Sequence, residues 1–183
     1  MSPLRQSPLS TELALLGFLR SRPMHGYEIY QLLADSQGLD GIWRMKLSRL
    51  YAILGRLEDH QYIVAHTEAQ GDRPPRKMFS LTAAGEEVFL EWLTTPVRQP
   101  RAMRLEFMLK LYFARLESSL VATQLVALQR RQCVEWLSGP LVASGTEESA
   151  EFRAVVSRYR HGQIVAIGEW LDWLTEEIEE VTT

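Results

Sequence analysis

The chain has 183 residues, of which 46% are hydrophobic and 23% are charged, the composition of a globular protein that can bury a core. It carries 20 lysines and arginines against 23 aspartates and glutamates, a formal charge of −3. This balance excludes a polybasic protein that holds nucleic acid by bulk charge, although it permits a local basic surface. The single cysteine, Cys133, excludes an internal disulfide framework and a cysteine-rich zinc module.

The first hydrophobic run, Leu13 to Leu19, is bracketed by Glu12 and Arg20. A membrane helix needs about 20 apolar residues, and no small-residue cleavage site follows the run as it does in a signal peptide. We therefore expect a cytoplasmic protein that makes no contact with a membrane.

Three helices are predicted in the first sixty residues. Apolar residues recur at helical spacing over 9–19, where Ser10 or Thr11 can act as the N-cap, and again over 25–36. The third helix begins near residues 46–48. Its apolar residues fall at i, i+3, i+4 and i+7, the pattern of a helix with one buried face: Leu50, Ile53, Leu54 and Leu57.

Two strands and a fourth helix follow. Residues 62–67 and 77–81 have strand character, and the turn-rich segment 70–75 predicts a hairpin with a long tip. Thr82 can cap a helix that runs to about Leu93. The order of these elements is that of a winged helix-turn-helix, so the predicted fold is mainly α with a small β-hairpin. We expect a winged helix-turn-helix DNA-binding domain over 1–95 and an all-α helical dimerisation domain over 96–183.

Only helices are predicted after residue 100. The first, over 104–115, is apolar around most of its circumference, which indicates burial on more than one side. The second can be capped by Ser118 or Ser119 and runs to Leu137. The last begins near Ser149 and has apolar residues at heptad spacing, which we interpret as a seam buried by a second copy, an ordinary three-helix core being the alternative. The predicted dimerisation residues are Leu105, Met108, Leu109, Tyr112, Ile164, Ile167, Leu171, Leu174 and Ile178.

The face of the third helix opposite its apolar stripe is suited to close approach to a DNA groove. Ser48, Ala52, Gly55 and Asp59 point away from the core, with Tyr51 on one flank and two arginines, Arg49 and Arg56, on the other. Small residues let the backbone come near, and arginine can bind a guanine edge or a phosphate.

The local charge supports the same interpretation. The window 44–56 contains Arg44, Lys46, Arg49 and Arg56 and no acidic residue, a charge of +4, and the hairpin tip adds Arg73, Arg76 and Lys77 against Asp72. A basic helix followed by a basic hairpin matches a protein that contacts one groove and the adjacent backbone of double-stranded DNA. A solvated surface helix with a charged loop is the alternative.

Four short motifs occur in one order between residues 25 and 85: His25-Gly26-Tyr27-Glu28, Leu50-Tyr51 with Arg56-Leu57-Glu58, Pro74-Pro75-Arg76-Lys77, and Leu81-Thr82-Ala83-Ala84-Gly85. In this arrangement the chain resembles the PadR family of transcriptional regulators. The segment 106–111 is similar to the carboxy-terminal domain of the longer members.

The resemblance implies a winged-helix repressor that dimerises through its carboxy-terminal helices. It implies that the helix with Tyr51 enters the major groove, and that Arg76 and Lys77 contact the backbone. His25 and Tyr27 lie at the start of the supporting helix, where family members can touch phosphate.

This sequence departs from the family at three positions. Lys46 stands where a small capping residue is usual, so the helix start can shift toward Ser48. Gln61 stands where a helix-ending glycine is frequent, and Gly55 replaces a larger polar residue.

Three other interpretations remain open. A winged helix can serve as a protein–protein interaction module without specific DNA binding, since fold does not determine function. An enzyme is less favoured because the sequence shows no phosphate-binding glycine loop, no HExxH and no grouped Ser, His and carboxylate, so we expect no catalytic residue, metal or cofactor. The four histidines are scattered along the chain. The third interpretation is a redox switch at Cys133, which we expect instead to pack as a small hydrophobe.

A small aromatic effector is a further candidate partner. Four tryptophans could line a pocket for it, plain packing being the alternative: Trp92, Trp136, Trp170 and Trp173.

Overall fold

The structure is a computed structural model that describes residues 10–35, 39, 41–70, 73–139 and 150–180. The chain forms two compact units. Among these residues, the first unit comprises those up to Leu93 together with Arg104–Lys110, and the second comprises Thr94–Met103 and those from Leu111 onward. None of the described helices is long and apolar enough to cross a membrane.

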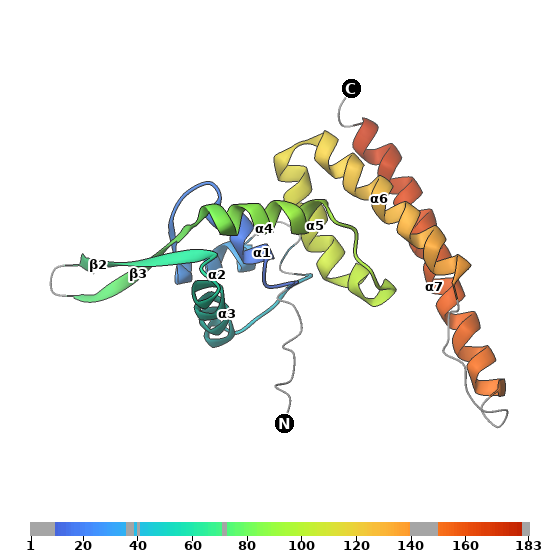
Figure 1. Cartoon of the computed structure of the whole chain (residues 1–183), viewed down its shortest axis with the longest axis horizontal. Helices are drawn as coiled ribbons and strands as arrows, with labels where there is room; N and C mark the ends of the chain where they lie inside the picture. Colours follow the sequence, from blue (N-terminus) through green and yellow to red (C-terminus); the bar gives the residue numbers. More distant parts are fainter. Residues whose placement is uncertain (1–9, 36–38, 40, 71–72, 140–149, 181–183) are drawn as a thin grey trace. The chain divides into compact units, whose positions relative to one another are not determined.

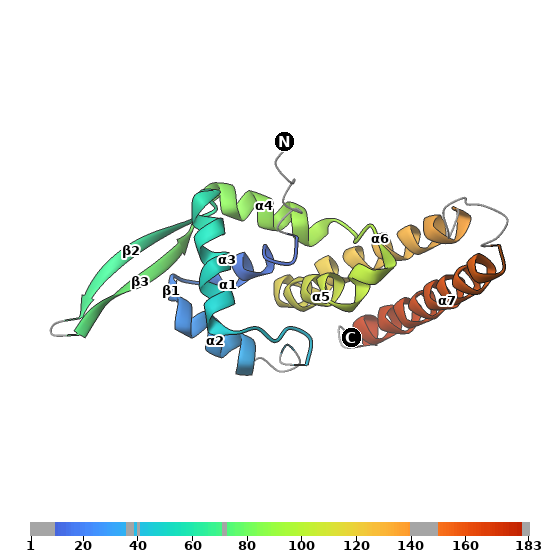
Figure 2. The same cartoon turned by 90° about the horizontal axis from the view of Figure 1, so that it is seen from below.

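The first unit is a winged helix: three helices, a small antiparallel sheet and a fourth helix (Figures 1 and 2). Its elements in chain order are α1 (Ala14–Leu19), β1 (Met24–His25), α2 (Gly26–Asp35), α3 (Leu47–Asp59), β2 (Ile63–Gln70), β3 (Arg73–Leu81) and α4 (Ala83–Thr94). The mainly helical fold class with a winged helix-turn-helix is thereby confirmed.

The first helix is shorter than its periodicity predicts. α1 begins at Ala14, and residues 11–13 form turns. Neither Ser10 nor Thr11 caps it, because the N-cap residue is Leu13, which has no capping side chain. The Ser10 hydroxyl instead donates a hydrogen bond to the Glu106 carboxylate. The predicted cap is wrong because this side chain is engaged in a tertiary contact.

The hairpin prediction is confirmed with two differences. β2 reaches Gln70 and β3 starts at Arg73, so the ladder runs from Ile63 opposite Leu81 to Gln70 opposite Arg73, and the expected long tip is mostly strand. The sheet also has a third strand, since β1 pairs with β3 and the strand order is β1-β3-β2. Two residues are too short a segment to show the alternation that identifies a strand.

The junction between the hairpin and α4 is closely packed. The predicted N-cap, Thr82, is confirmed: its hydroxyl accepts a hydrogen bond from the Gly85 N–H at 3.0 Å and lies 2.8 Å from the Gln61 carbonyl oxygen. A β-carbon at Gly85 would lie 2.0 Å from the Tyr62 carbonyl oxygen, so only glycine fits there. Gln61 itself has φ of 61°, which explains why glycine suits this position.

Lys110 joins the end of α4 to the start of α5 (Glu106–Glu117) within the first unit. Its buried Nζ donates a hydrogen bond of 2.7 Å to the Trp92 carbonyl oxygen and lies 3.4 Å from the Glu106 carboxylate. Burial lowers the pKa of Lys110, and the charge of Glu106 opposes that shift. The amine therefore satisfies a carbonyl near the carboxyl end of α4, where a cation is favourable.

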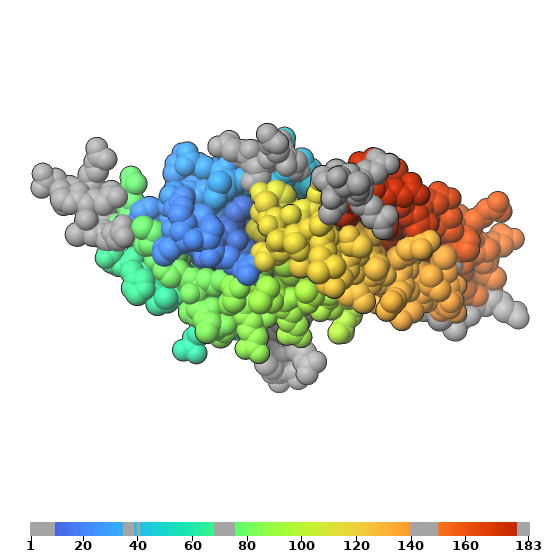
Figure 3. All heavy atoms as spheres, turned by 90° about the horizontal axis from the view of Figure 1, so that it is seen from above, coloured from blue at the N-terminus to red at the C-terminus, as the bar shows by residue number. Residues whose placement is uncertain are grey.

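The second unit is helical. It contains the 3-10 helix η1 (Pro100–Arg104) up to Met103, the later part of α5, and two long helices, α6 (Ser119–Ser138) and α7 (Ala150–Glu180). Ser118 caps α6 as predicted, accepting a hydrogen bond from the Val121 N–H. α6 and α7 pack side by side and run in opposite directions (Figures 1 and 3). The buried Gln129 of α6 holds the Val97 backbone through hydrogen bonds of 2.7 and 3.2 Å.

Candidate nucleic-acid interface

The exposed face of α3 carries most of the side chains that the sequence assigns to DNA. The predicted apolar stripe is confirmed, since Leu50, Ile53, Leu54 and Leu57 are fully buried. On the other sides of the helix Ser48, Arg49, Tyr51, Ala52 and Asp59 are exposed, and Gly55 is half-buried. α3 begins at Leu47 with Lys46 as its N-cap residue, whose side chain makes no capping bond. The helix thus presents small and polar side chains along one side.

Lys46 and Arg49 supply positive charge at the start of this face. Both side chains are exposed, and within the part of the chain that the structure describes neither forms an ion pair. Their charge is therefore available to an anionic partner.

Arg56 is held by a carboxylate. Its Nε donates to one Glu12 oxygen at 3.1 Å, and its terminal nitrogen donates to the other oxygen of the same carboxylate. A bidentate pair of this kind compensates the arginine charge. The +4 expected for residues 44–56 is therefore reduced, and the basic surface is concentrated at the amino-terminal end of α3.

Tyr51 rests on the start of α2. Its phenol ring lies over the α-carbon of Gly26, and 44% of Tyr51 is exposed. α2 and α3 are adjacent in both views of the winged helix (Figures 1 and 2). One side of the ring is thereby supported by α2 while the rest reaches solvent.

The start of α2 is fixed by a carboxylate that we did not predict as a site residue. Glu28 accepts a 2.7 Å hydrogen bond from the His25 N–H and lies 3.1 Å from Arg22. The His25 hydrogen bond, followed by the Arg22 charge, lowers the pKa of Glu28 against the opposing effect of burial. A glutamate three residues after the cap position is the sequence signal that could have identified it. Tyr27 is exposed beside this turn.

The wing residues Arg76 and Lys77 are both exposed and adjacent on β3. Successive strand residues face opposite sides of a sheet, so the two side chains diverge. Lys77 Nζ lies 3.4 Å from Glu58 of α3, whereas Arg76 forms no ion pair among the described residues. The Arg73 side chain lies outside the described residues.

The predicted dimerisation seam on α7 is covered within the same chain, which corrects the expectation that it is left for a second copy. Because α6 packs along α7, four of its five residues are buried and Ile167 is half-buried: Ile164, Leu171, Leu174 and Ile178. The other predicted dimerisation residues lie in or next to α5. Leu109 is buried there, and Leu105, Met108 and Tyr112 are half-buried.

A different face of α7, which the sequence analysis missed, carries exposed apolar residues. Phe152, Val155, Tyr159 and Trp173 are 72%, 63%, 64% and 51% exposed. Positions 152, 155, 159, 162, 166, 169 and 173 belong to one heptad series, in which 162 is glycine, 166 is alanine and 169 is glutamate. α7 therefore has two seams, one buried against α6 and one exposed.

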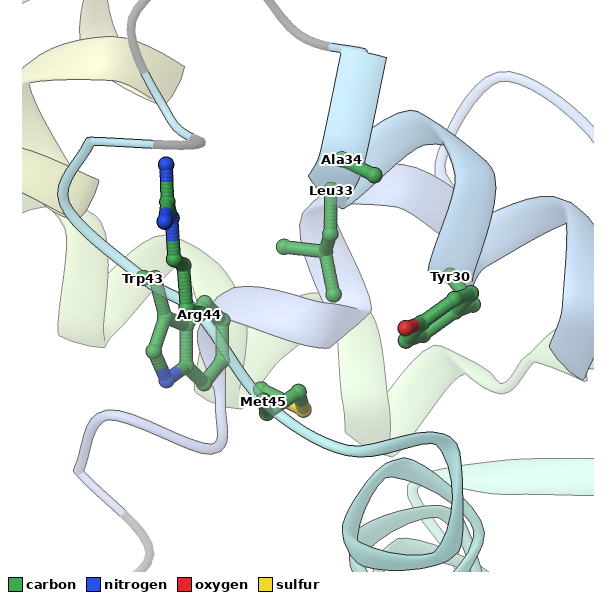
Figure 4. Close-up of a pocket in the computed structure, with 6 residues that line it drawn as sticks. All are labelled: Tyr30, Leu33, Ala34, Trp43, Arg44 and Met45. Atoms are coloured by element: carbon green, nitrogen blue, oxygen red, sulfur yellow. The ribbon is translucent and has the colours of Figure 1, made fainter.

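Each unit has a cavity lined by aromatic and charged side chains. In the first unit, a cavity of about 380 Å³ lies between α2 and the segment before α3, lined by Tyr30, Leu33, Trp43, Arg44 and Met45 (Figure 4). In the second unit, a cavity of about 430 Å³ is lined by Trp136, Arg101, Glu135, Arg160 and Gln163 among others. The four tryptophans do not gather around one pocket: Trp92 packs in the core of the first unit and Trp173 is exposed.

No group of three or more histidine, cysteine or acidic side chains within the described ranges could hold a metal ion. Cys133 is buried in α6, and burial, followed by the charge of Asp172, raises the pKa of its thiol to about 11. The thiol is therefore protonated at neutral pH.

Comparison with known proteins finds a similar family over the winged helix. Residues 15–91 match the Transcriptional regulator PadR-like family. The Negative transcriptional regulator PadR of Bacillus subtilis (strain 168) is 35% identical over 121 residues, which cover 65% of this chain and 65% of the relative, slightly less than two thirds of its length.

Solved structures of similar proteins include two of B. subtilis PadR. The complex with operator DNA is 26% identical and has a TM-score of 0.46, covering 94% of this chain and 99% of that one. The complex with p-coumaric acid is 26% identical and has a TM-score of 0.42, covering 93% and 99%. A protein from Streptococcus mutans, smu.1704, is 30% identical over 46% of this chain and 74% of its own, with a TM-score of 0.38.

Proposed function

We propose that this chain is a PadR-like transcriptional regulator and not an enzyme, and that it binds double-stranded DNA sequence-specifically as a homodimeric repressor. The observation that carries the proposal is the exposed face of α3, where Lys46, Arg49 and Tyr51 flank the small residues Ser48 and Ala52. The B. subtilis relative is named a negative regulator, which favours repression over activation. The cytoplasmic location stays a prediction.

In this proposal α3 enters the major groove. Ser48 and Ala52 let the helix backbone approach the base edges, and Arg49 is placed to bind guanine through two hydrogen bonds. Arg56 contributes less than we expected from sequence, because Glu12 already occupies its guanidinium. Base contacts are therefore assigned to the first two turns of α3.

The wing and the start of α2 are proposed to contact phosphates. Arg76 is exposed without an ion pair to a described residue, and Lys77 can exchange its 3.4 Å contact with Glu58 for a phosphate. His25 and Tyr27 lie where α2 begins, and the amino-terminal end of a helix favours anions. Such contacts add affinity without sequence preference. Arg73, at the start of β3, stays a predicted contact.

A salt-dependent gel-shift assay with the DNA upstream of the protein's own gene tests the proposal. We expect a complex that competitor DNA of scrambled sequence does not displace and that weakens as salt rises. If every fragment binds only as well as scrambled DNA at low salt, the repressor proposal fails. A protein–protein interaction module is then the better explanation of the winged helix.

Dimerisation is proposed to use the exposed seam of α7, with a second copy of this chain as its occupant. The charge of α7 changes along the helix: residues 150–162 contain three arginines and one glutamate, whereas residues 163–180 contain six carboxylates and no lysine or arginine. Two α7 helices that pair antiparallel about a two-fold axis place each basic half beside the partner's acidic half. This complementarity favours self-association over an unrelated partner.

A small effector is proposed to release the repressor from DNA by binding the cavity of the second unit. Trp136 offers an aromatic surface there, and Arg101 and Arg160 offer positive charge, so an aromatic compound with an anionic group fits its lining. p-Coumaric acid, present in one B. subtilis PadR structure, is a suitable probe. We expect calorimetric binding that Arg101→Gln weakens, together with loss of the DNA complex. Binding that Arg101→Gln leaves unchanged would contradict this assignment.

A further inference from the structure

Gly26, the first residue of α2, is buried beneath the phenol ring of Tyr51. A β-carbon at this position would lie 2.7 Å from Cε1 of Tyr51, 3.0 Å from Cζ and 3.1 Å from the hydroxyl oxygen. The first of these distances is shorter than carbon atoms tolerate. The ring of Tyr51 can therefore occupy its present position only above a residue without a side chain.

The backbone does not explain the glycine. Its φ lies outside the left-handed range that favours glycine, and alanine is the better helix former. The close contact is with the tip of the Tyr51 side chain and not with the backbone. A methyl group at residue 26 can therefore be accommodated if the phenol ring moves, at little cost to the fold.

The backbone of α3 cannot follow such a movement. Leu50, Ile53 and Leu54 are fully buried on either side of Tyr51 and fix the helix against the core. We therefore expect the Tyr51 side chain, rather than α3, to rotate. The direction of its hydroxyl is thus determined by the space above Gly26.

We propose that Gly26 is a positioning residue for DNA recognition, which acts through Tyr51. By leaving room for the ring, it holds the Tyr51 hydroxyl in a fixed direction over the start of α2, at the flank of the α3 face assigned to the groove. Residue 26 itself contacts no base in this proposal. The inference rests on the proposed function, since it concerns the same interface.

The test compares Gly26→Ala, Tyr51→Ala and the double variant, each as the full-length chain. Two DNA probes are used. One is the fragment of genomic DNA that the purified wild-type protein enriches most strongly from a mixture of fragments, and the other is a scrambled duplex of the same length. We expect Gly26→Ala to weaken binding to the genomic fragment roughly tenfold, about as much as Tyr51→Ala, because a misdirected side chain loses its contact. The double variant should bind no more weakly than Tyr51→Ala alone.

Gly168→Ala is the matched control, because a β-carbon at Gly168 meets no atom within 4 Å and the residue lies in α7. It should bind both probes as the wild type does. Thermal unfolding is measured for all variants, and Gly26→Ala should change Tm by no more than a few degrees.

Three results overturn the inference. Gly26→Ala binds the genomic fragment as tightly as the wild type; or it weakens binding further when Tyr51 is already alanine; or it lowers Tm strongly and Tyr51→Ala does not restore it. Failure of the proposed function gives a different result, because the wild-type protein then shows no preference for the genomic fragment over the scrambled duplex, and both proposals fall.

Discussion

Arg49 and Arg56 of α3 differ in what they already contact. Arg49 is exposed and has no ion pair within the described part of the chain, so its guanidinium can bind DNA without breaking a contact. Arg56 must first leave Glu12, whose two oxygens it binds. Two residues that share a sequence pattern are thus assigned different roles, one in recognition and one in tying α3 to the segment before α1.

We predict that Arg56→Ala lowers the free energy of unfolding by about 1 kcal/mol, because it removes a partly exposed bidentate ion pair. Urea denaturation measures the change. Glu12→Gln should cause a similar loss, and the double variant should lose little more than either single variant. If Arg56→Ala leaves stability unchanged and impairs DNA binding instead, the ion pair is not the main role of this residue.

Cys133 is expected to be chemically inert in the folded protein. A thiol with a pKa of about 11 is far less ionised at pH 8 than an ordinary cysteine, whose pKa is about 8.5. We therefore predict that iodoacetamide labels Cys133 at least roughly 100-fold more slowly in buffer than in urea, as followed by mass spectrometry. Equal rates in both solvents would show that the thiol is accessible, and a redox role would then have to be reconsidered.

Single residues also show where sequence reasoning ends. The exposed and buried faces of α3 could be predicted, because both follow from a local period of 3.6 residues. The partner of Arg56 could not, because Glu12 lies 44 residues away in the sequence and only the packing of the winged helix brings the two together. The contact of Tyr51 with Gly26 was missed for the same reason.

The junction of the wing and α4 leaves no room for a side chain at Gly85. A methyl group at Gly85 would be 2.0 Å from the Tyr62 carbonyl oxygen and 2.8 Å from a Leu81 methyl carbon. The first contact is with backbone that the sheet holds in place, so the fold must open to relieve it. α4 therefore depends on glycine at this position.

We predict that Gly85→Ala lowers the free energy of unfolding by about 3 kcal/mol, the upper range of overpacking costs. Denaturation curves of the two variants Gly85→Ala and Gly168→Ala make the comparison. Gly168→Ala should instead be neutral or stabilising by up to about 1 kcal/mol, because alanine favours a helix and nothing obstructs its methyl group. Equal stability of the two variants would contradict the packing described for Gly85.

The helices of the second unit show what periodicity can and cannot predict. The heptad spacing of Ile164, Leu171 and Leu174 correctly indicates a buried seam. It does not identify what buries them, and α6 of the same chain does so instead of a second copy. The exposed seam was missed because Gly162, Ala166 and Glu169 interrupt its apolar pattern.

For the whole molecule, the exposed seam of α7 predicts the oligomeric state. Tyr159→Glu places a carboxylate in the middle of that seam, so we expect the dimer to dissociate into protomers of 21.0 kDa, as measured by light scattering after size-exclusion chromatography. Leu120→Glu is the control, because Leu120 is equally exposed but lies at the start of α6. If Tyr159→Glu remains dimeric, or if Leu120→Glu dissociates the dimer equally, the interface lies elsewhere.

The overall charge of −3 bears on how such a dimer selects DNA. With few uncompensated cations per protomer, binding to arbitrary sequence is expected to be weak, and the preference for one sequence depends on the start of α3. Two copies of α3 related by a two-fold axis require half-sites about 10 base pairs or a multiple apart. A footprint of the protein on the genomic fragment that it enriches most strongly measures the distance between the two half-sites.

The most direct measurement is the affinity of wild-type and Arg49→Ala protein for the most enriched genomic fragment and for its scrambled counterpart, at one fixed salt concentration. We predict that the wild type prefers the genomic fragment and that Arg49→Ala loses about 1–3 kcal/mol of binding free energy on that fragment and much less on the scrambled one. Equal weakening on both, or no weakening on either, would contradict the assignment of sequence recognition to the exposed face of α3.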